Sequence, residues 1–154
     1  MLSRPTTDQI LLDCRAELLG TIDAAITDPA AKVAVQMMEN VLRNCAARAA
    51  HEIAWMIAEN EAMTAYAERV AASGVSTLAV TDALAAFAGG SSAGLHLDDV
   101  SQTYNLASQC LSVALEAAIA GGDPALEAAG RAIIDKRLAT ELEIMGEWTF
   151  VGRG

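Results

Sequence analysis

The chain has 154 residues, of which 53% are hydrophobic and only 4% are aromatic, and its formal net charge is −10. This length fits a single domain over residues 1–154 that can bury a core. An acidic surface repels phosphodiester backbones and anionic lipid, so the charge argues against nucleic acid and membrane surfaces as partners. Alanine is abundant and strand-like patterns are nearly absent, which predicts an all-α fold.

We also expect a soluble, cytoplasmic protein. The opening residues contain no apolar signal core, and no run approaches the ~18 apolar residues that cross a bilayer. The three cysteines, Cys14, Cys45 and Cys110, are odd in number and widely spaced. This usage is typical of reduced thiols in the core of a cytosolic protein.

The first predicted helix covers residues 7–26 and begins after a cap at Thr6 or Thr7. Its apolar side is formed by Leu11, Cys14, Leu18, Leu19, Ile22, Ala25 and Ile26. The connection Thr27-Asp28-Pro29 is tight. The first two helices should therefore be antiparallel neighbours.

The second predicted helix is the longest and covers residues 29–72, with Pro29 in its first turn. At helical spacing, one face carries Val35, Met38, Leu42, Cys45, Ala49, Ile53, Met56, Met63, Ala67 and Val70. We expect this face to be buried. A straight helix of this length spans about 65 Å, whereas a domain of this size has a radius of gyration of about 15 Å. We therefore expect either a break or kink near residues 59–61, or a projecting helix that a second chain covers.

Three further helices are predicted. A short one ends before Gly89-Gly90, and the next begins at Asp98 or Asp99. The latter has a seam with steps of 4, 3, 4, 3 and 4, formed by Val100, Tyr104, Ala107, Leu111, Ala114 and Ala118. The last helix starts at Asp123-Pro124 and ends at Gly146, and its buried side is Leu126, Ile133, Ile134, Leu138, Leu142 and Met145. Trp148 and Phe150 are expected to pack onto the bundle or onto a neighbour. The predicted fold is an antiparallel bundle of about five helices with one long central helix.

The most informative polar feature is a stripe on the long helix, formed by Asn40, Asn44, Arg48, His51 and Trp55. Steps of 4, 4, 3 and 4 place these residues on one side, next to the apolar face. Tyr104 from the facing helix could join them. We consider three interpretations: the solvated edge of an amphipathic helix, with Arg48 paired to Glu52 or another carboxylate; an interface with a partner protein; or a pocket for a small polar ligand.

No catalytic signature stands out, so whether the chain is an enzyme stays open. A di-metal site in a helical bundle needs Glu-x-x-His pairs. The sequence has two histidines, His51 and His96, and neither has a Glu three residues before it. No Gly-x-Ser-x-Gly motif is present. We predict no metal site and no cofactor.

Three segments resemble a family of small, uncharacterised bacterial helical proteins: RPTTDQILLDCRAEL, KVAVQMMENVLRNCAARAAHE and LEAAGRAIIDKRLATELEI. Members of that family are commonly encoded beside aminoglycoside-phosphotransferase-like kinases and acyl-CoA dehydrogenases. The closing GEWTFVGRG departs from the family's pattern, and the family supplies no catalytic residues to carry over.

Two functional hypotheses follow. The first is a non-catalytic accessory protein that forms a homodimer, with the seam from Val100 to Ala118 or the end of the long helix at the contact. The resemblance implies a partner enzyme of acyl-CoA-type metabolism. The alternative is a small enzyme or ligand-binding protein with its pocket between Asn40 and Trp55.

Overall fold

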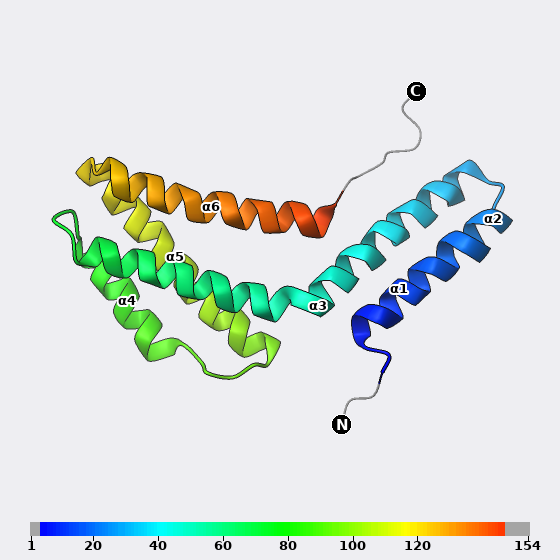
Figure 1. Ribbon diagram of the computed structural model, residues 1–154, viewed down its shortest axis with the longest axis horizontal. Coiled ribbons are helices and arrows are strands. Elements are labelled where there is room, and N and C mark those ends of the chain that lie inside the picture. The colour runs from blue at the N-terminus through cyan, green and yellow to red at the C-terminus, as the bar shows by residue number, and fades with distance from the viewer. Residues whose placement is uncertain (1–3, 147–154) are drawn as a thin grey trace. The chain divides into compact units, whose positions relative to one another are not determined.

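The computed structural model describes residues 4–146 (Figure 1). Its elements are α1 (Thr7–Glu17), a π-helical turn η1 (Leu18–Ile22), α2 (Asp23–Ala25), α3 (Pro29–Ala71), α4 (Leu78–Gly90), α5 (Leu97–Gly121) and α6 (Pro124–Met145). If α1, η1 and α2 are taken as one continuous arm, the described residues form five helices, and they contain no β-strand. The predicted all-α fold with a long central helix is confirmed.

Local sequence signals explain where the helices begin and end. The Asp28 carboxylate accepts a hydrogen bond from the Ala31 amide (2.8 Å) at the start of α3. Asp123 does the same for the amides of Ala125 and Leu126 (both 3.0 Å) at the start of α6. Gly122 ends α5 with φ of +66°, a left-handed conformation that favours glycine.

The described residues pack into two compact units. We call residues 4–52 with 140–146 the hairpin unit, and Ile53–Ala139 the core unit. Helices α3 and α6 each contribute residues to both. The predicted single domain over residues 1–154 stays a prediction.

In the hairpin unit, α1 runs antiparallel to the first part of α3. Arg15 pairs with Glu39 (2.6 Å), and Lys32 pairs with Asp23 (3.7 Å), so residues later in α1 and α2 meet residues earlier in α3. The predicted antiparallel pairing of the first two helices is confirmed. The buried hydrophobic residues of this unit are few: Leu18, Val35, Ala46 and Ile144.

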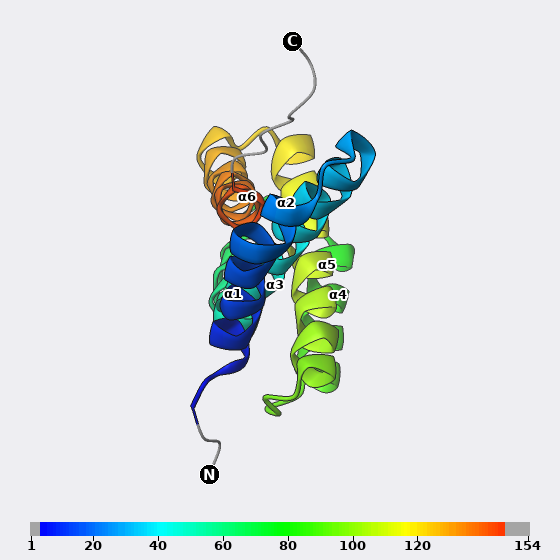
Figure 2. The same ribbon diagram turned by 90° about the vertical axis from the view of Figure 1, so that its right-hand side faces the viewer.

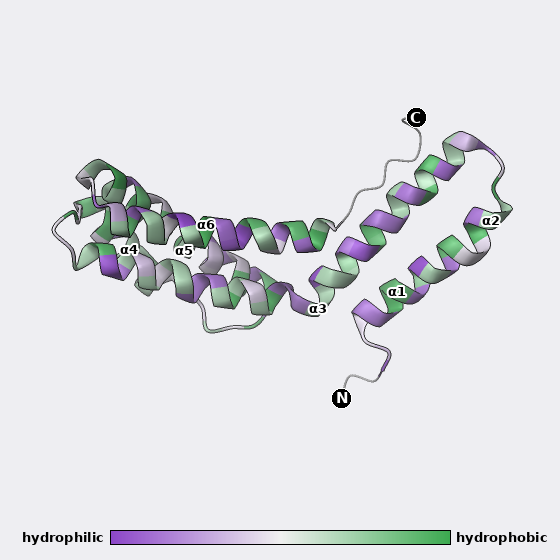
Figure 3. Cartoon of the chain, turned by 45° about the horizontal axis from the view of Figure 1, so that its top comes forward, coloured by the Kyte–Doolittle hydropathy of each residue, from purple (hydrophilic) through white to green (hydrophobic). Residues whose placement is uncertain are grey.

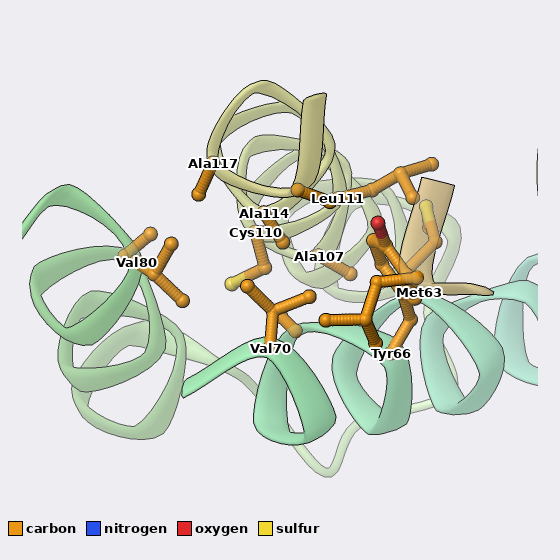
Figure 4. Packing of buried hydrophobic residues seen from close by; sticks show 13 residues of the cluster. Met63, Tyr66, Val70, Val80, Ala107, Cys110, Leu111, Ala114 and Ala117 are labelled. Atoms are coloured by element: carbon orange, nitrogen blue, oxygen red, sulfur yellow. The ribbon is translucent and has the colours of Figure 1, made fainter. Parts of the chain in front are cut away.

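The core unit holds the main hydrophobic cluster. In Figure 4, side chains from α3, α4 and α5 converge, with Val70 and Val80 facing Cys110. Helix α4 lies alongside α5, as Figure 1 and Figure 2 both show. Every predicted seam residue of α5 except the half-buried Tyr104 is fully buried, as the 4-3 spacing predicts.

The prediction for α3 was only partly correct. Residues 59–61 are helical and α3 is continuous from Pro29 to Ala71, so no break is present there. In its first part, Met38 is 56% exposed, and Cys45 and Ala49 are exposed as well. The reason is that α1 packs against the side that carries Val35 and Ala46, about 80° around the helix from Met38 and Cys45.

In two other regions the residues that are buried also differ from those predicted. In α1 and η1, Cys14, Leu19 and Ile22 are exposed, although Leu18 is buried as predicted. In α6, Leu138 and Leu142 are exposed, and Ile144 is buried in their place. Trp148 and Phe150 lie outside the described residues.

Candidate functional site

The structure divides the predicted site residues between the two units. Asn40, Asn44, Arg48 and His51 belong to the hairpin unit, whereas Trp55 and Tyr104 belong to the core unit. Each group is therefore described with the contacts of its own unit.

Asn40 and Asn44 lie beside the C-terminal end of α6. The buried Asn40 donates from Nδ2 to the Gln36 carbonyl (3.1 Å) and accepts from the Arg43 guanidinium (2.9 Å). Arg43 also donates to the Met145 carbonyl (2.7 Å). In the amide orientation that satisfies both of its side-chain atoms, Asn44 donates to the Ile144 carbonyl (2.6 Å).

These contacts have a structural role. The last carbonyls of a helix lack partners within the helix and carry partial negative charge, so amide and guanidinium donors satisfy them. Gly146 follows with φ of +58°, and a side chain there would meet the Arg43 guanidinium. This part of the predicted stripe is a cap for α6.

Arg48 and His51 lie at the exposed edge of α3. Arg48 pairs with Glu52 one turn later (2.7 Å) and with Glu141 of α6 (3.7 Å). The Arg48–Glu52 pair is the contact that we expected if the stripe were the solvated edge of an amphipathic helix. His51 acts on Asp8 of α1: the pKa of Asp8 is lowered mainly by a hydrogen bond with Thr6, and to a smaller extent by the charge of His51.

In the core unit, Tyr104 joins three helices. Its hydroxyl donates to Glu59 of α3 (2.5 Å) and accepts from Nε and Nη2 of Arg137 on α6 (3.1 and 2.8 Å). Arg137 also pairs with Glu59 (3.3 Å) and lies over the Tyr104 ring, 5.2 Å from its centre. We call these three residues the Tyr104 cluster. Trp55, on α3, is half-buried.

The electrostatics of the Tyr104 cluster favour a neutral phenol. Burial raises the pKa of Tyr104, and the hydrogen bond to Glu59 raises it further, while Arg137 acts in the opposite direction. Because the hydroxyl is hydrogen-bonded to both an anion and a cation, its donor and acceptor capacity is engaged. The cluster therefore fixes α3, α5 and α6 to one another.

A partly open pocket of about 230 Å³ lies in the core unit. Its walls come from α3, from the connection between α4 and α5, and from the first turns of α5: Ile57, Asn60, residues 92–95, Val100 and Thr103. Asn60 is only 7% exposed, and its Oδ1 has no hydrogen-bond partner. The unpaired, buried oxygen distinguishes Asn60 from Thr103, whose hydroxyl has hydrogen-bond partners.

The sequence analysis did not identify Glu59, Arg137 or Asn60 as candidate site residues. All three lie in the core unit. A signal for Glu59 was present, because it continues the stripe four residues after Trp55. Asn60 is a polar residue within the spacing Met56, Asn60, Met63, which would otherwise be an apolar seam. Nothing in the local sequence around Arg137 indicates Tyr104 as its partner.

No group of three or more His, Cys, Asp or Glu residues within 4–146 is placed to hold a metal ion. All three cysteines are free thiols, and only Cys110 is buried, so the expectation that Cys14 and Cys45 lie in a core was wrong. Burial raises the pKa of Cys110. A search of residues 4–146 for bilayer-crossing helices finds none that is both long and apolar enough.

The fold and these contacts define an all-α helical bundle protein whose polar clusters mainly join helices. Comparison with known proteins found no family model, no curated protein and no solved structure that matches the chain.

Proposed function

We propose that this protein is a non-catalytic helical interaction protein of the cytoplasm, and that it forms a homodimer through its hairpin unit. The observation that carries this proposal is the exposed apolar surface of α3. We define the α3 apolar face as six exposed residues: Val33, Ala34, Met37, Met38, Val41 and Cys45. Monomeric proteins rarely leave a contiguous surface of this kind uncovered.

The spacing of this face suits helix–helix contact. Ala34, Met38, Val41 and Cys45 follow one another in steps of 4, 3 and 4. Such steps form a narrow seam along one side of a helix, as in coiled coils. Met38 and Val41, at the centre, are 56% and 58% exposed.

The rest of the hairpin unit also has much uncovered apolar surface. Large hydrophobic residues of its first arm are exposed: Ile10, Leu12, Leu19 and Ile22. Figure 3 shows apolar residues along both arms of this unit. Small units bury a small fraction of their surface, so one with so few buried hydrophobic residues gains stability from a partner.

A second copy of the chain is the occupant that fits this face. In a two-fold dimer identical patches face each other. The α3 apolar face contains no charged residue. Two copies can therefore meet there without placing like charges in contact, although each chain carries a net charge of −10.

The experiment compares two double variants by light scattering coupled to size exclusion. Met38→Lys with Val41→Lys places two charges on the α3 apolar face. Leu78→Lys with Ile119→Lys makes the same change at exposed residues of the core unit. We expect wild type and the control to have twice the 16.0 kDa chain mass at micromolar concentration, and the α3 variant to have the single mass. A monomeric wild type would contradict the proposal.

The resemblance noted for the sequence supports a second part of the proposal, in which the dimer assists an enzyme that acts on acyl-CoA-type substrates. Co-expression of the chain with an acyl-CoA dehydrogenase tests this part. Co-elution of the two proteins is the expected result, and independent elution would argue against it.

A further inference from the structure

The apolar series on α3 that runs from Ala34 to Cys45 continues in both directions, and its two ends differ in chemistry. Toward the middle of the helix, steps of 3 and 4 lead to Arg48 and Glu52, which pair with each other (2.7 Å). Toward the start of the helix, a step of 3 leads to Ala31 in the first turn. We call the extended series the α3 seam: Ala31, Ala34, Met38, Val41, Cys45, Arg48 and Glu52. The α3 seam is charged at one end and small and uncharged at the other.

This difference distinguishes the two ways in which identical copies of α3 can face each other. If the helices run parallel and in register, each residue of the seam faces its own copy. Arg48 then faces Arg48 and Glu52 faces Glu52, and like charges that face each other weaken association. Met38 faces Met38 and Ala34 faces Ala34, so large side chains meet large ones and small side chains leave gaps.

An antiparallel arrangement of the two helices avoids the poor packing. Its two-fold axis lies between Met38 and Val41, so each Met38 faces Val41 of the other copy. One layer further out, the small Ala34 faces the larger Cys45. Side chains of different size then lie opposite each other, which lets the two helices interdigitate.

The antiparallel arrangement also separates the like charges. Arg48, whose side chain is 43% exposed, faces Ala31 of the other copy, where a small side chain leaves room for the guanidinium. Glu52 lies one layer beyond, opposite the start of α3 of the other copy. The first turn of a helix carries partial positive charge, which favours a carboxylate there. Packing and electrostatics therefore favour the same arrangement.

We propose that the dimer forms by antiparallel packing of two α3 seams, with Met38 against Val41 and Ala34 against Cys45 of the second copy. This inference rests on the dimer proposed above and adds its orientation and register. It also determines where the exposed Cys45 thiols lie. They face each other in the parallel arrangement, whereas in the antiparallel one they are about 16 Å apart along the helix axis. A disulfide needs Cα atoms about 4–7 Å apart.

Disulfide cross-linking of the full chain distinguishes the two arrangements. Cys14→Ser removes the other exposed thiol and leaves Cys45 in place. Under mild oxidation we expect no cross-link in this background, and a disulfide between position 34 and Cys45 of the second copy in most chains once Ala34→Cys is added. Ala50→Cys changes an exposed alanine about 160° around α3 from Ala34, and this matched control should not cross-link. Non-reducing gels and mass spectrometry of the linked peptides give the result.

Light scattering on the same samples separates the failure of this inference from the failure of the dimer. A disulfide between two Cys45 residues would overturn the antiparallel arrangement and leave the dimer in place. The absence of the Ala34→Cys cross-link in a chain of double mass would do the same. A single chain mass would contradict the dimer itself, and the arrangement with it.

A second pair of variants tests the arrangement without cysteine chemistry. Ala31→Glu places a carboxylate opposite Arg48 of the second copy, and Ala31→Gln is its uncharged control. We expect the glutamate variant to dimerise about fivefold more tightly than the glutamine variant, because the two-fold axis creates two exposed ion pairs. In the parallel arrangement two glutamates would face each other. Equal or weaker dimerisation of the glutamate variant, measured by sedimentation over a range of concentrations, would overturn the proposal.

Discussion

The two tyrosines of the core unit show how the same side chain takes different roles. Tyr104 donates to Glu59 and accepts from Arg137. Tyr66 is only 3% exposed, and its hydroxyl has no hydrogen-bond partner. Burial raises the pKa of both. Replacing each tyrosine with phenylalanine removes the hydroxyl and keeps the ring. The change in the free energy of unfolding then measures what the hydroxyl contributes to stability.

Tyr66→Phe should raise the free energy of unfolding by about 1 kcal/mol, because it removes a buried hydroxyl without a partner. Tyr104→Phe should lower it by about 2 kcal/mol, because it leaves Glu59 and Arg137 without a shared partner. Urea unfolding of the two variants and the wild type measures both values. Effects of the same sign would show that the environments of these hydroxyls do not differ in this way.

At the scale of elements, α6 approaches its neighbours closely in the core unit at Gly130. A Cβ atom there would lie 2.7 Å from the Tyr66 hydroxyl and 2.8 Å from a methyl carbon of Leu115. Gly89, near the end of α4, has no such neighbour within 4 Å. One glycine is required by packing, and the other is not.

Alanine at these two glycines should therefore have opposite effects. Gly130→Ala should lower the free energy of unfolding by about 1–3 kcal/mol through overpacking. Gly89→Ala should raise it by about 0.5–1 kcal/mol, because alanine loses less conformational freedom in a helix. Thermal unfolding followed by circular dichroism measures both shifts. If Gly130→Ala were neutral, α6 would not pack this closely.

The end of α6 is the second element whose stability depends on particular side chains. Arg43→Ala removes a donor from the Met145 carbonyl, so the last turn of α6 should fray, at a cost of about 1 kcal/mol. Amide hydrogen exchange at residues 142–145 should accelerate. Arg131→Ala removes an exposed arginine that pairs with Glu127 within α6, and it serves as the control. Equal exchange in the two variants would mean that Arg43 does not cap this helix.

At the scale of the whole molecule, buried apolar surface is distributed unequally between the units. The core unit contains the main hydrophobic cluster, whereas the hairpin unit buries few hydrophobic residues and exposes many. A helical arm with so little core gains stability by mass action when a partner binds it. The proposed homodimer accounts for the exposed residues of α3 without requiring any catalytic role.

The sequence by itself determined the helical state and most helix boundaries. The caps at Asp28 and Asp123 and the glycine at 122 act through residues only a few positions away, so they can be recognised from local sequence. The seam of α5 was also predictable, because its 4-3 spacing selects a single face of the helix.

Only the tertiary structure decided which face of α3 is buried and which partners the polar residues find. Its first part is apolar on two sides, and burial of the Val35 side rather than the Met38 side depends on where α1 packs. Asn44 meets the Ile144 carbonyl, and Tyr104 meets Arg137, across long separations in the chain. Such pairings depend on folding as a whole, because residues far apart in sequence become neighbours only when the helices pack.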